Sequence, residues 1–347
     1  MIPGPEAWSL GGAFGVFFVA TALVVAGGIP LTGLADRLAD RTGLGEAVMG
    51  AVFLGAVTSI SGITASVVAA WRGDPSLALS NAYGGIAVQT AFLAVADVFY
   101  RKANLEHAAA SSENILFGVM LITLLCLSLW GMTSPEWLIG PVHPATPLLF
   151  AAYGFFLHMI RRSRVEPMWF PRQTRETVAD ENEEDRRDDQ PTGRLLAKLL
   201  LFAGMVMVGG WLLVRSGEAI ALRTGIASSA VGALGTAVAT SMPELVTSIA
   251  AVRRGALTLA VGSILGGNAF DVLFAAMADI AYTEGSIYHH ASAREPNLIV
   301  LAMILAGLMV FGLVIREKKG PAGIGMESLL VLVVYVLGMI TILGIPA

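Results

Sequence analysis

Long apolar segments are the feature of this 347-residue chain that most restricts its fold. A helix needs about 20 apolar residues to cross the hydrocarbon core of a bilayer. Only 14% of the residues are charged, against roughly 25% in soluble domains. The sequence therefore predicts an all-α, polytopic membrane protein with ten spans. The expected spans are residues 8–29, 43–70, 76–99, 114–131, 145–160, 195–214, 225–252, 257–281, 297–315 and 326–345.

Lysine and arginine are distributed unevenly between the loops on the two sides of the predicted membrane. When the loop at 161–194 is placed in the cytoplasm, 18 of the 22 basic residues fall on that side. This is the distribution that the positive-inside rule requires. The remaining four are Arg72, Arg215, Arg223 and Arg294. We therefore expect both termini outside and a location in the plasma (inner) membrane.

An internal repeat relates the two halves of the chain. Residues 41–100 align without a gap with residues 223–282, with 21 identities in 60 positions. The offset crosses five predicted spans. Because this number is odd, the second copy enters the membrane in the opposite orientation to the first. Inverted repeats are typical of secondary transporters, whose sites lie between the repeats near the bilayer midplane. We expect two inverted five-helix repeats, at 1–165 and 195–347, joined by a charged cytoplasmic loop at 166–194.

Two carboxylates lie deep in predicted spans of the second repeat. Glu244 follows Thr240, Ser241 and Pro243, and Asp271 lies in the next span. An acidic residue at bilayer depth is costly and usually marks an ion or proton path, although a helix–helix hydrogen bond by a protonated acid is the alternative. Pro243 interrupts the helix and frees a carbonyl. Carboxylate, hydroxyl and carbonyl oxygens together suit a hard cation.

The motifs Thr-Ser-x-Pro-Glu at 240–244 and Gly-Gly-Asn-x-Phe-Asp at 266–271 resemble the paired α-repeats of the sodium/calcium exchanger superfamily, the calcium/cation antiporters. The resemblance is close over residues 236–274, and the layout of two five-span halves extends it over nearly the whole chain. It implies a central cation site where the repeats cross. It also implies alternating access, in which the first and sixth spans slide against the rest.

The resemblance assigns ligand positions one by one. Glu244 corresponds to the ligand glutamate of the second repeat, and Asp271 to the acidic or amide ligand of span eight. Gly267 falls where many members have serine. Asn268 is three residues from Asp271 and shares its helix face. The full candidate metal site consists of Glu244, Asp271, Thr240, Ser241, Asn268, Ala237, Gly267, Thr58, Ser59 and Gln89.

The first repeat departs from this motif pattern. It keeps the Thr-Ser pair at 58–59, but Ser61 and Gly62 stand in place of the proline and the glutamate. Gln89 stands opposite Asp271. The site therefore carries at most two negative charges, which neutralise one Ca²⁺ or two monovalent ions. This is fewer charges than the family uses to hold several sodium ions.

We expect a secondary active cation antiporter, most directly a calcium/cation exchanger. Its partners are the lipid bilayer and small cations (Ca²⁺, Na⁺ or H⁺), with no other cofactor and no nucleic acid, and the sequence is compatible with a monomer. A monovalent cation/proton antiporter and a non-transporting relative remain alternatives, while inverted repeats disfavour a channel. An enzyme is not expected, because the chain lacks the protease and hydrolase motifs His-Glu-x-x-His and Gly-x-Ser-x-Gly. Asp97 and Asp279, which match across the repeats near span ends, are interpreted as caps or helix-packing residues.

Overall fold

The computed structural model describes residues 5–42, 56–100, 103–165, 169, 171–172, 191–318, 320 and 324–345. Residues 43–55 of the second expected span and most of the 166–194 loop lie outside the described residues. The longer helices are α1 (Leu10–Thr42), α3 (Ile60–Trp71), α4 (Pro75–Asp97), α6 (Ser112–Thr133), α7 (Ala145–Val165), α8 (Thr192–Thr224), α11 (Met242–Arg254), α12 (Leu257–Asp271), α13 (Leu273–Ala281), α14 (Arg294–Ile315) and α15 (Met326–Leu343). Shorter pieces are η1 (Pro5–Ala7), α5 (Leu105–Ala108), α9 (Ser228–Ala230), η2 (Val231–Thr236), α10 (Ala237–Thr240) and η3 (Ile287–His289).

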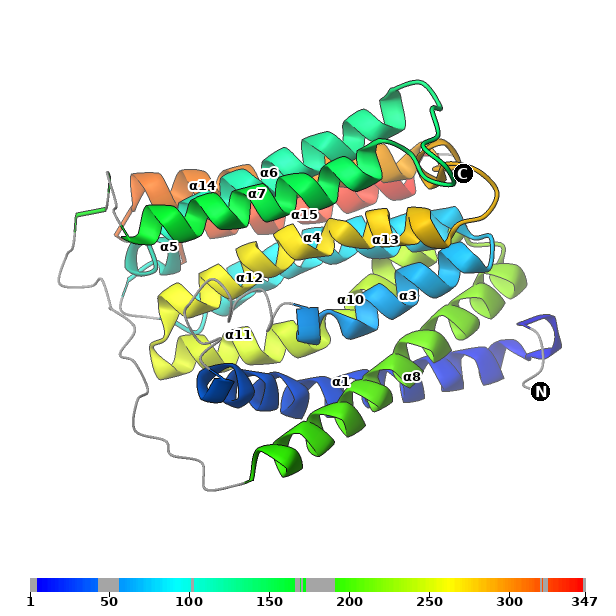
Figure 1. Ribbon diagram of the computed structural model, residues 1–347, viewed down its shortest axis with the longest axis horizontal. Helices are drawn as coiled ribbons and strands as arrows, with labels where there is room; N and C mark the ends of the chain where they lie inside the picture. The colour runs from blue at the N-terminus through cyan, green and yellow to red at the C-terminus, as the bar shows by residue number, and fades with distance from the viewer. Residues whose placement is uncertain are drawn as a thin grey trace.

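The long helices run side by side in layers, with both ends of the chain at the same end of the molecule (Figure 1). In the described part of the chain, seven helical stretches are long and apolar enough to cross a membrane. The helices α1 and α8 form one face, and α6, α7, α14 and α15 form the opposite face (Figure 1). Helix α4 lies between these faces and is buried along almost its whole length. A helix that is apolar on all sides belongs in such a position.

Pairs of glycines allow the close approach of α1 and α8 to the central helices. A Cβ atom on Gly28 would lie 2.6 Å from the Cγ atom of Pro243. A Cβ atom on Gly210 would lie 2.8 Å from the carbonyl oxygen of Ser61. Small residues let membrane helices pack with their backbones close together. Gly28 and Gly210 are related by the offset of the repeat alignment, as are Ser61 and Pro243. The internal repeat therefore extends into α1 and α8.

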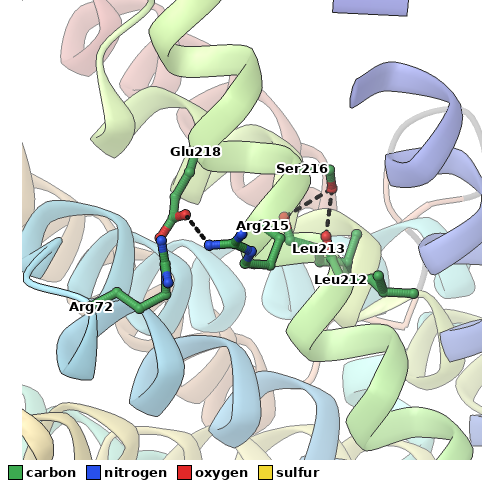
Figure 2. Close-up of polar contacts among 6 residues, drawn as sticks. All are labelled: Arg72, Leu212, Leu213, Arg215, Ser216 and Glu218. Carbon is green, nitrogen blue, oxygen red and sulfur yellow. Dashed lines mark hydrogen bonds and ion pairs between the residues drawn. The ribbon is translucent and has the colours of Figure 1, made fainter. Parts of the chain in front are cut away.

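An ion-pair group ties the end of α3 to α8 (Figure 2). The Nε atom of Arg72 donates to Oε1 of Glu218 at 2.5 Å, and Nη1 of Arg215 lies 3.8 Å from Oε2 of the same carboxylate. Arg215 is buried in α8. The acid between the two guanidinium groups therefore compensates a buried positive charge, which would be costly without a counter-ion.

Asp97 joins the end of α4 to two other segments. Its Oδ1 atom accepts a hydrogen bond from the backbone N–H of Leu105, at 2.8 Å. Its Oδ2 atom accepts one from the N–H of Gly325, also at 2.8 Å, at the start of α15. These two bonds satisfy backbone donors at the ends of helices, as a cap does, and connect the first half of the chain to the second.

Asp279, the counterpart of Asp97 in the repeat alignment, makes the same kind of contacts in the second half of the chain. Its Oδ1 atom accepts from the N–H of Ile287 at 3.0 Å, and its Oδ2 atom accepts from the N–H of His143 at 2.9 Å. The hydroxyl of Thr146 also donates to Oδ2, at 2.6 Å. The interpretation of both aspartates as caps is confirmed. Each aspartate ties its own half of the chain to the start of the last helix of the other half.

Replacing Asp279 with Asn should lower the stability of the protein by about 2–3 kcal/mol, because the charged acceptor is lost and an amide N–H₂ group faces buried donors. Thermal unfolding of the detergent-purified protein would show this as a lower midpoint. The exposed Glu284, replaced with Gln, is the matched control. Equal unfolding midpoints for the two variants would contradict a structural role for this carboxylate.

Candidate functional site

The second-repeat motif forms the helix break that its proline predicts. Helix α10 ends at Thr240 and α11 begins at Met242, with Ser241 between them at φ −93° and ψ 1°. Pro243 lies in the first turn of α11, where its missing N–H leaves no helical hydrogen bond unmade. The break places Glu244 in the same turn, in the interior of the helix bundle.

Asp271, the last residue of α12, connects both halves of the chain through hydrogen bonds. Its Oδ1 atom accepts from the hydroxyl of Ser59 at 2.6 Å. Its Oδ2 atom accepts from Nε2 of Gln89 at 2.9 Å. The same Nε2 atom also donates to the hydroxyl of Ser241, at 3.1 Å. Gln89 aligns with Asp271 in the internal repeat, and Ser59 aligns with Ser241, so corresponding residues of the two repeats meet here.

These side chains surround a small cavity in the centre of the molecule. The centre of a water-sized sphere can occupy about 10 Å³ of it, which is room for about one water molecule or one dehydrated cation. Six of the ten predicted site residues line the cavity: Glu244, Asp271, Thr240, Ser241, Ser59 and Gln89.

Two oxygen atoms of the cavity-lining residues lack hydrogen-bond donors in the described part of the chain. One is Oε2 of Glu244 and the other is Oδ1 of Asn81, and both are buried. The Nδ2 atom of Asn81 donates to the carbonyl of Gly62 at 3.2 Å and to the hydroxyl of Ser66 at 2.9 Å, so its oxygen is the free end. Buried acceptors without donors are costly. A cation bound in the cavity is one way to satisfy such an oxygen.

The remaining four predicted ligands do not line the cavity. The carbonyl of Ala237 accepts hydrogen bonds within its own helix, from the N–H of Ser241 and the hydroxyl of Thr240. The Nδ2 atom of Asn268 donates to the carbonyl of Ile86 at 3.3 Å. This hydrogen bond joins α12 to α4. The other two residues outside the lining are Thr58 and Gly267. Their role as ligands stays a prediction.

Ser61 and Asn81 line the cavity although the sequence motif does not include them. The hydroxyl of Ser61 donates to the carbonyl of Thr240 at 3.3 Å. Asn81 lies in a predominantly apolar span, and that isolated amide is the signal that could have identified it. Ser61 occupies the position of Pro243 in the repeat alignment, which gives no indication of a polar role.

An aromatic ring fills the space next to Gly62, the position where the resemblance implies a glutamate. A Cβ atom on Gly62 would lie 2.5 Å from Cε2 of Phe274, closer than real Cβ contacts come. Phe274 also lines the cavity. The first repeat has glycine at the position of the glutamate, and the Phe274 ring leaves no space there for a longer side chain.

Comparison with known proteins decides the family. The model of the sodium/calcium exchanger protein family matches residues 12–160 and 195–344. The chain belongs to the sodium/calcium exchanger family. Its relatives include an uncharacterized membrane protein of Methanocaldococcus jannaschii, 26% identical over 284 residues, which are 80% of this chain and 82% of the relative.

Two solved exchanger structures have a similar fold. The sodium–calcium exchanger NCX_Mj superposes with a TM-score of 0.63 at 18% identity, over 96% of this chain and 99% of that one. The H⁺/Ca²⁺ exchanger CAX superposes with a TM-score of 0.68 at 13% identity, over 96% of this chain and 85% of that one. The predicted family is thus confirmed. The chain is an integral, multi-pass membrane protein of a cation-antiporter family, not an enzyme.

Replacing Gly62 with Ala should destabilise this exchanger homologue by about 1–3 kcal/mol, because the added methyl group overlaps the Phe274 ring. Replacing Phe274 with Leu in the same chain should recover part of the loss. The two changes should therefore be non-additive in a double-mutant cycle of thermal unfolding. Gly267→Ala is the control, because no atom lies within 4 Å of a Cβ there. A Gly62→Ala protein as stable as this control would contradict the proposed filling of the position.

Proposed function

We propose that this protein is a secondary active cation antiporter that exchanges Ca²⁺ for another cation by alternating access. The observation that carries the proposal is the buried, unpartnered Oε2 atom of Glu244, in the same small cavity as Asp271. An ionisable group inside a membrane protein needs a partner or a transport role. A cation between the two acids supplies that partner.

The oxygen atoms around the cavity fit a divalent cation. Glu244 and Asp271 provide the charge that balances one Ca²⁺, and the hydroxyls of Ser59 and Thr240 and the amide of Asn81 line the same space. Ca²⁺ prefers six to eight oxygen ligands, including carboxylates and neutral oxygens. Gln89 now donates to Asp271, and rotation of its amide would present the oxygen atom to a bound ion instead.

The charge of the site limits the counter-ion. Two carboxyl groups can release one Ca²⁺ against two protons or two monovalent cations. Gln89 is neutral where its repeat partner Asp271 is acidic, and Gly62 supplies no ligand. We therefore propose that the cavity holds one Ca²⁺ at a time. The fold shared with an H⁺/Ca²⁺ exchanger and a sodium–calcium exchanger is compatible with either counter-ion.

We propose ten membrane spans in two inverted five-helix repeats, with both termini outside and the 161–194 loop in the cytoplasm of a plasma-membrane protein. The hydrogen bonds at Asp97 and Asp279 support the two repeats. The bond between Asp97 and Leu105 in the first half corresponds, at the offset of the repeat alignment, to the bond between Asp279 and Ile287 in the second half. The two chain ends lie at the same end of the molecule (Figure 1), as an even number of spans requires.

A monovalent cation/proton antiporter is the second candidate. The observation that favours it is Phe274, whose ring fills the place of a first-repeat acid. The site then has only two carboxyl groups, and one of them can bind a proton while the other balances a monovalent ion. The two candidates share the same cavity and the same carboxylates. They differ only in the ion that the protein accepts.

Uptake of ⁴⁵Ca²⁺ into liposomes containing the purified protein tests the proposal. An outward Na⁺ gradient and, separately, a pH gradient should identify the counter-ion by which of them drives uptake. Glu244→Gln and Asp271→Asn should reduce uptake to the level of protein-free liposomes, because each removes one of the two charged ligands. Glu284→Gln, at an exposed glutamate, should transport like the wild type.

No Ca²⁺ uptake with either gradient would overturn the proposed calcium exchange. Na⁺ or K⁺ exchange against protons in the same vesicles, lost in Glu244→Gln, would then establish the second candidate. Absence of all exchange would indicate a non-transporting relative.

A further inference from the structure

Glu106 is a buried acid far along the bundle from the central cavity. It lies in α5, the short helix between α4 and α6, and only 1% of its surface is exposed. Its Oε1 atom accepts a hydrogen bond from the hydroxyl of Ser328 at 2.5 Å. Its Oε2 atom is buried and has no hydrogen-bond partner. The ion pairs found in the described part of the chain do not include Glu106. An anion in this position is therefore poorly compensated.

Two further acids approach Glu106 from other elements. A Cβ atom on Gly312 of α14 would lie 2.9 Å from Cγ of Glu327 and 3.0 Å from Cγ of Glu106, so these two side chains lie next to each other. Asp97, at the end of α4, is also close enough for its charge to act on Glu106. Carboxyl groups from α4, α5 and α15 thus gather at one place.

Two basic side chains in the described part of the chain near this cluster contact backbone carbonyls. The guanidinium group of Arg316 donates to the backbone carbonyls of His107, at 3.1 Å, and of Arg172. The ring of His107 faces the carbonyl of Arg316, with Nδ1 at 2.6 Å.

The other end of the molecule shows the same arrangement with a neutral group. At the offset of the repeat alignment, Tyr288 corresponds to Glu106, and Thr146 corresponds to Ser328. The hydroxyls of Tyr288 and Thr146 lie 3.2 Å apart, in place of the bond between Glu106 and Ser328. Burial raises the pKa of Tyr288 well above its ordinary value, so that side chain stays neutral. Of these two corresponding positions, only that of Glu106 carries a group that can ionise near neutral pH.

We propose that Glu106 is a proton-binding, pH-sensing site, and that its neutral form keeps α5 docked against the start of α15. This site is separate from the proposed transport cavity. The bonds it supports are those of Asp97 with Leu105 and Gly325, which fix α5 and α15 to α4. A second negative charge on Glu106 repels Asp97 and loosens this connection. Under the proposed topology, the site lies on the cytoplasmic side.

The direction of the pH effect follows from the pKa shift. Burial, reinforced by the negative charge of Asp97, raises the pKa of Glu106 to about 7, above the ordinary value of 4.5. The folded protein therefore holds a proton that the unfolded chain releases. The stability from this proton is fully present below the ordinary pKa and is lost as the pH rises through the folded pKa.

Infrared difference spectroscopy of the protein in lipid, titrated with pH, tests the proposal directly. The wild type should show a protonated carboxyl signal that disappears with a midpoint near neutral pH. Glu106→Gln should remove this component, and the control Glu284→Gln should keep it. Identical titrations of wild type and Glu106→Gln would overturn the proposal.

Ser328→Ala provides a second test that does not remove the acid. The Ser328 hydroxyl stabilises the ionised form, so its loss should move the midpoint of the carboxyl signal to higher pH. An unchanged midpoint would contradict the proposal even if Glu106→Gln failed to fold. The unfolding temperature of wild type should also fall more steeply than that of Glu106→Gln between about pH 5 and about pH 8. None of these measurements depends on transport, so they stand apart from the test of the antiporter proposal.

Discussion

The hydrogen bonds that Asp271 accepts from Ser59 and Gln89 are the interaction around which the rest of the structure is arranged. An acid in the middle of a membrane protein must be satisfied by its neighbours. Both donors come from the first half of the chain, so the two halves must cross at this point. The crossing requires helices that approach closely, which Gly28 and Gly210 allow. The helices also end where they cross: α12 ends at Asp271, and α10 ends at Thr240, just before Pro243.

The framework of the protein keeps the repeat relationship, whereas its functional centre does not. Asp97 and Asp279 make corresponding bonds at opposite ends. In the centre, Glu244 has a glycine as its counterpart, and the Phe274 ring covers that glycine. The aspartates at these two positions accept hydrogen bonds from buried backbone N–H groups, which must be satisfied in both halves of the chain. The position of Gly62 shows that one half can lack the acid of Glu244 without loss of the fold.

Much of the fold and part of the site could be predicted from the sequence. Apolar length identified an all-helical, multi-pass membrane fold, and the proline motif located the break next to Glu244. The count of ten spans stays a prediction. The internal repeat aligned Gln89 with Asp271 and placed both in the site, but only the structure shows that they share a hydrogen bond. Asn81 was missed: its amide in an apolar span was a signal, but α4 is buried on all sides and its periodicity does not show which face meets the cavity.

Two contacts could not be derived from residue spacing. Asn268 shares a helix face with Asp271, as expected, yet its side chain binds the α4 backbone at Ile86 and not the cavity. Phe274 is an ordinary apolar residue in the sequence, and only the approach of α13 to α3 places its ring against Gly62. Such side-chain directions depend on helix packing, which the repeat alone does not specify.

Equilibrium dialysis of the purified protein against ⁴⁵Ca²⁺ tests the central claim most directly, because it measures the site without a gradient or a counter-ion. The account predicts one Ca²⁺ bound per chain, and loss of that binding in both Glu244→Gln and Asp271→Asn. Two or more ions per chain, or unchanged binding in these variants, would contradict a single cation site formed by the two carboxylates.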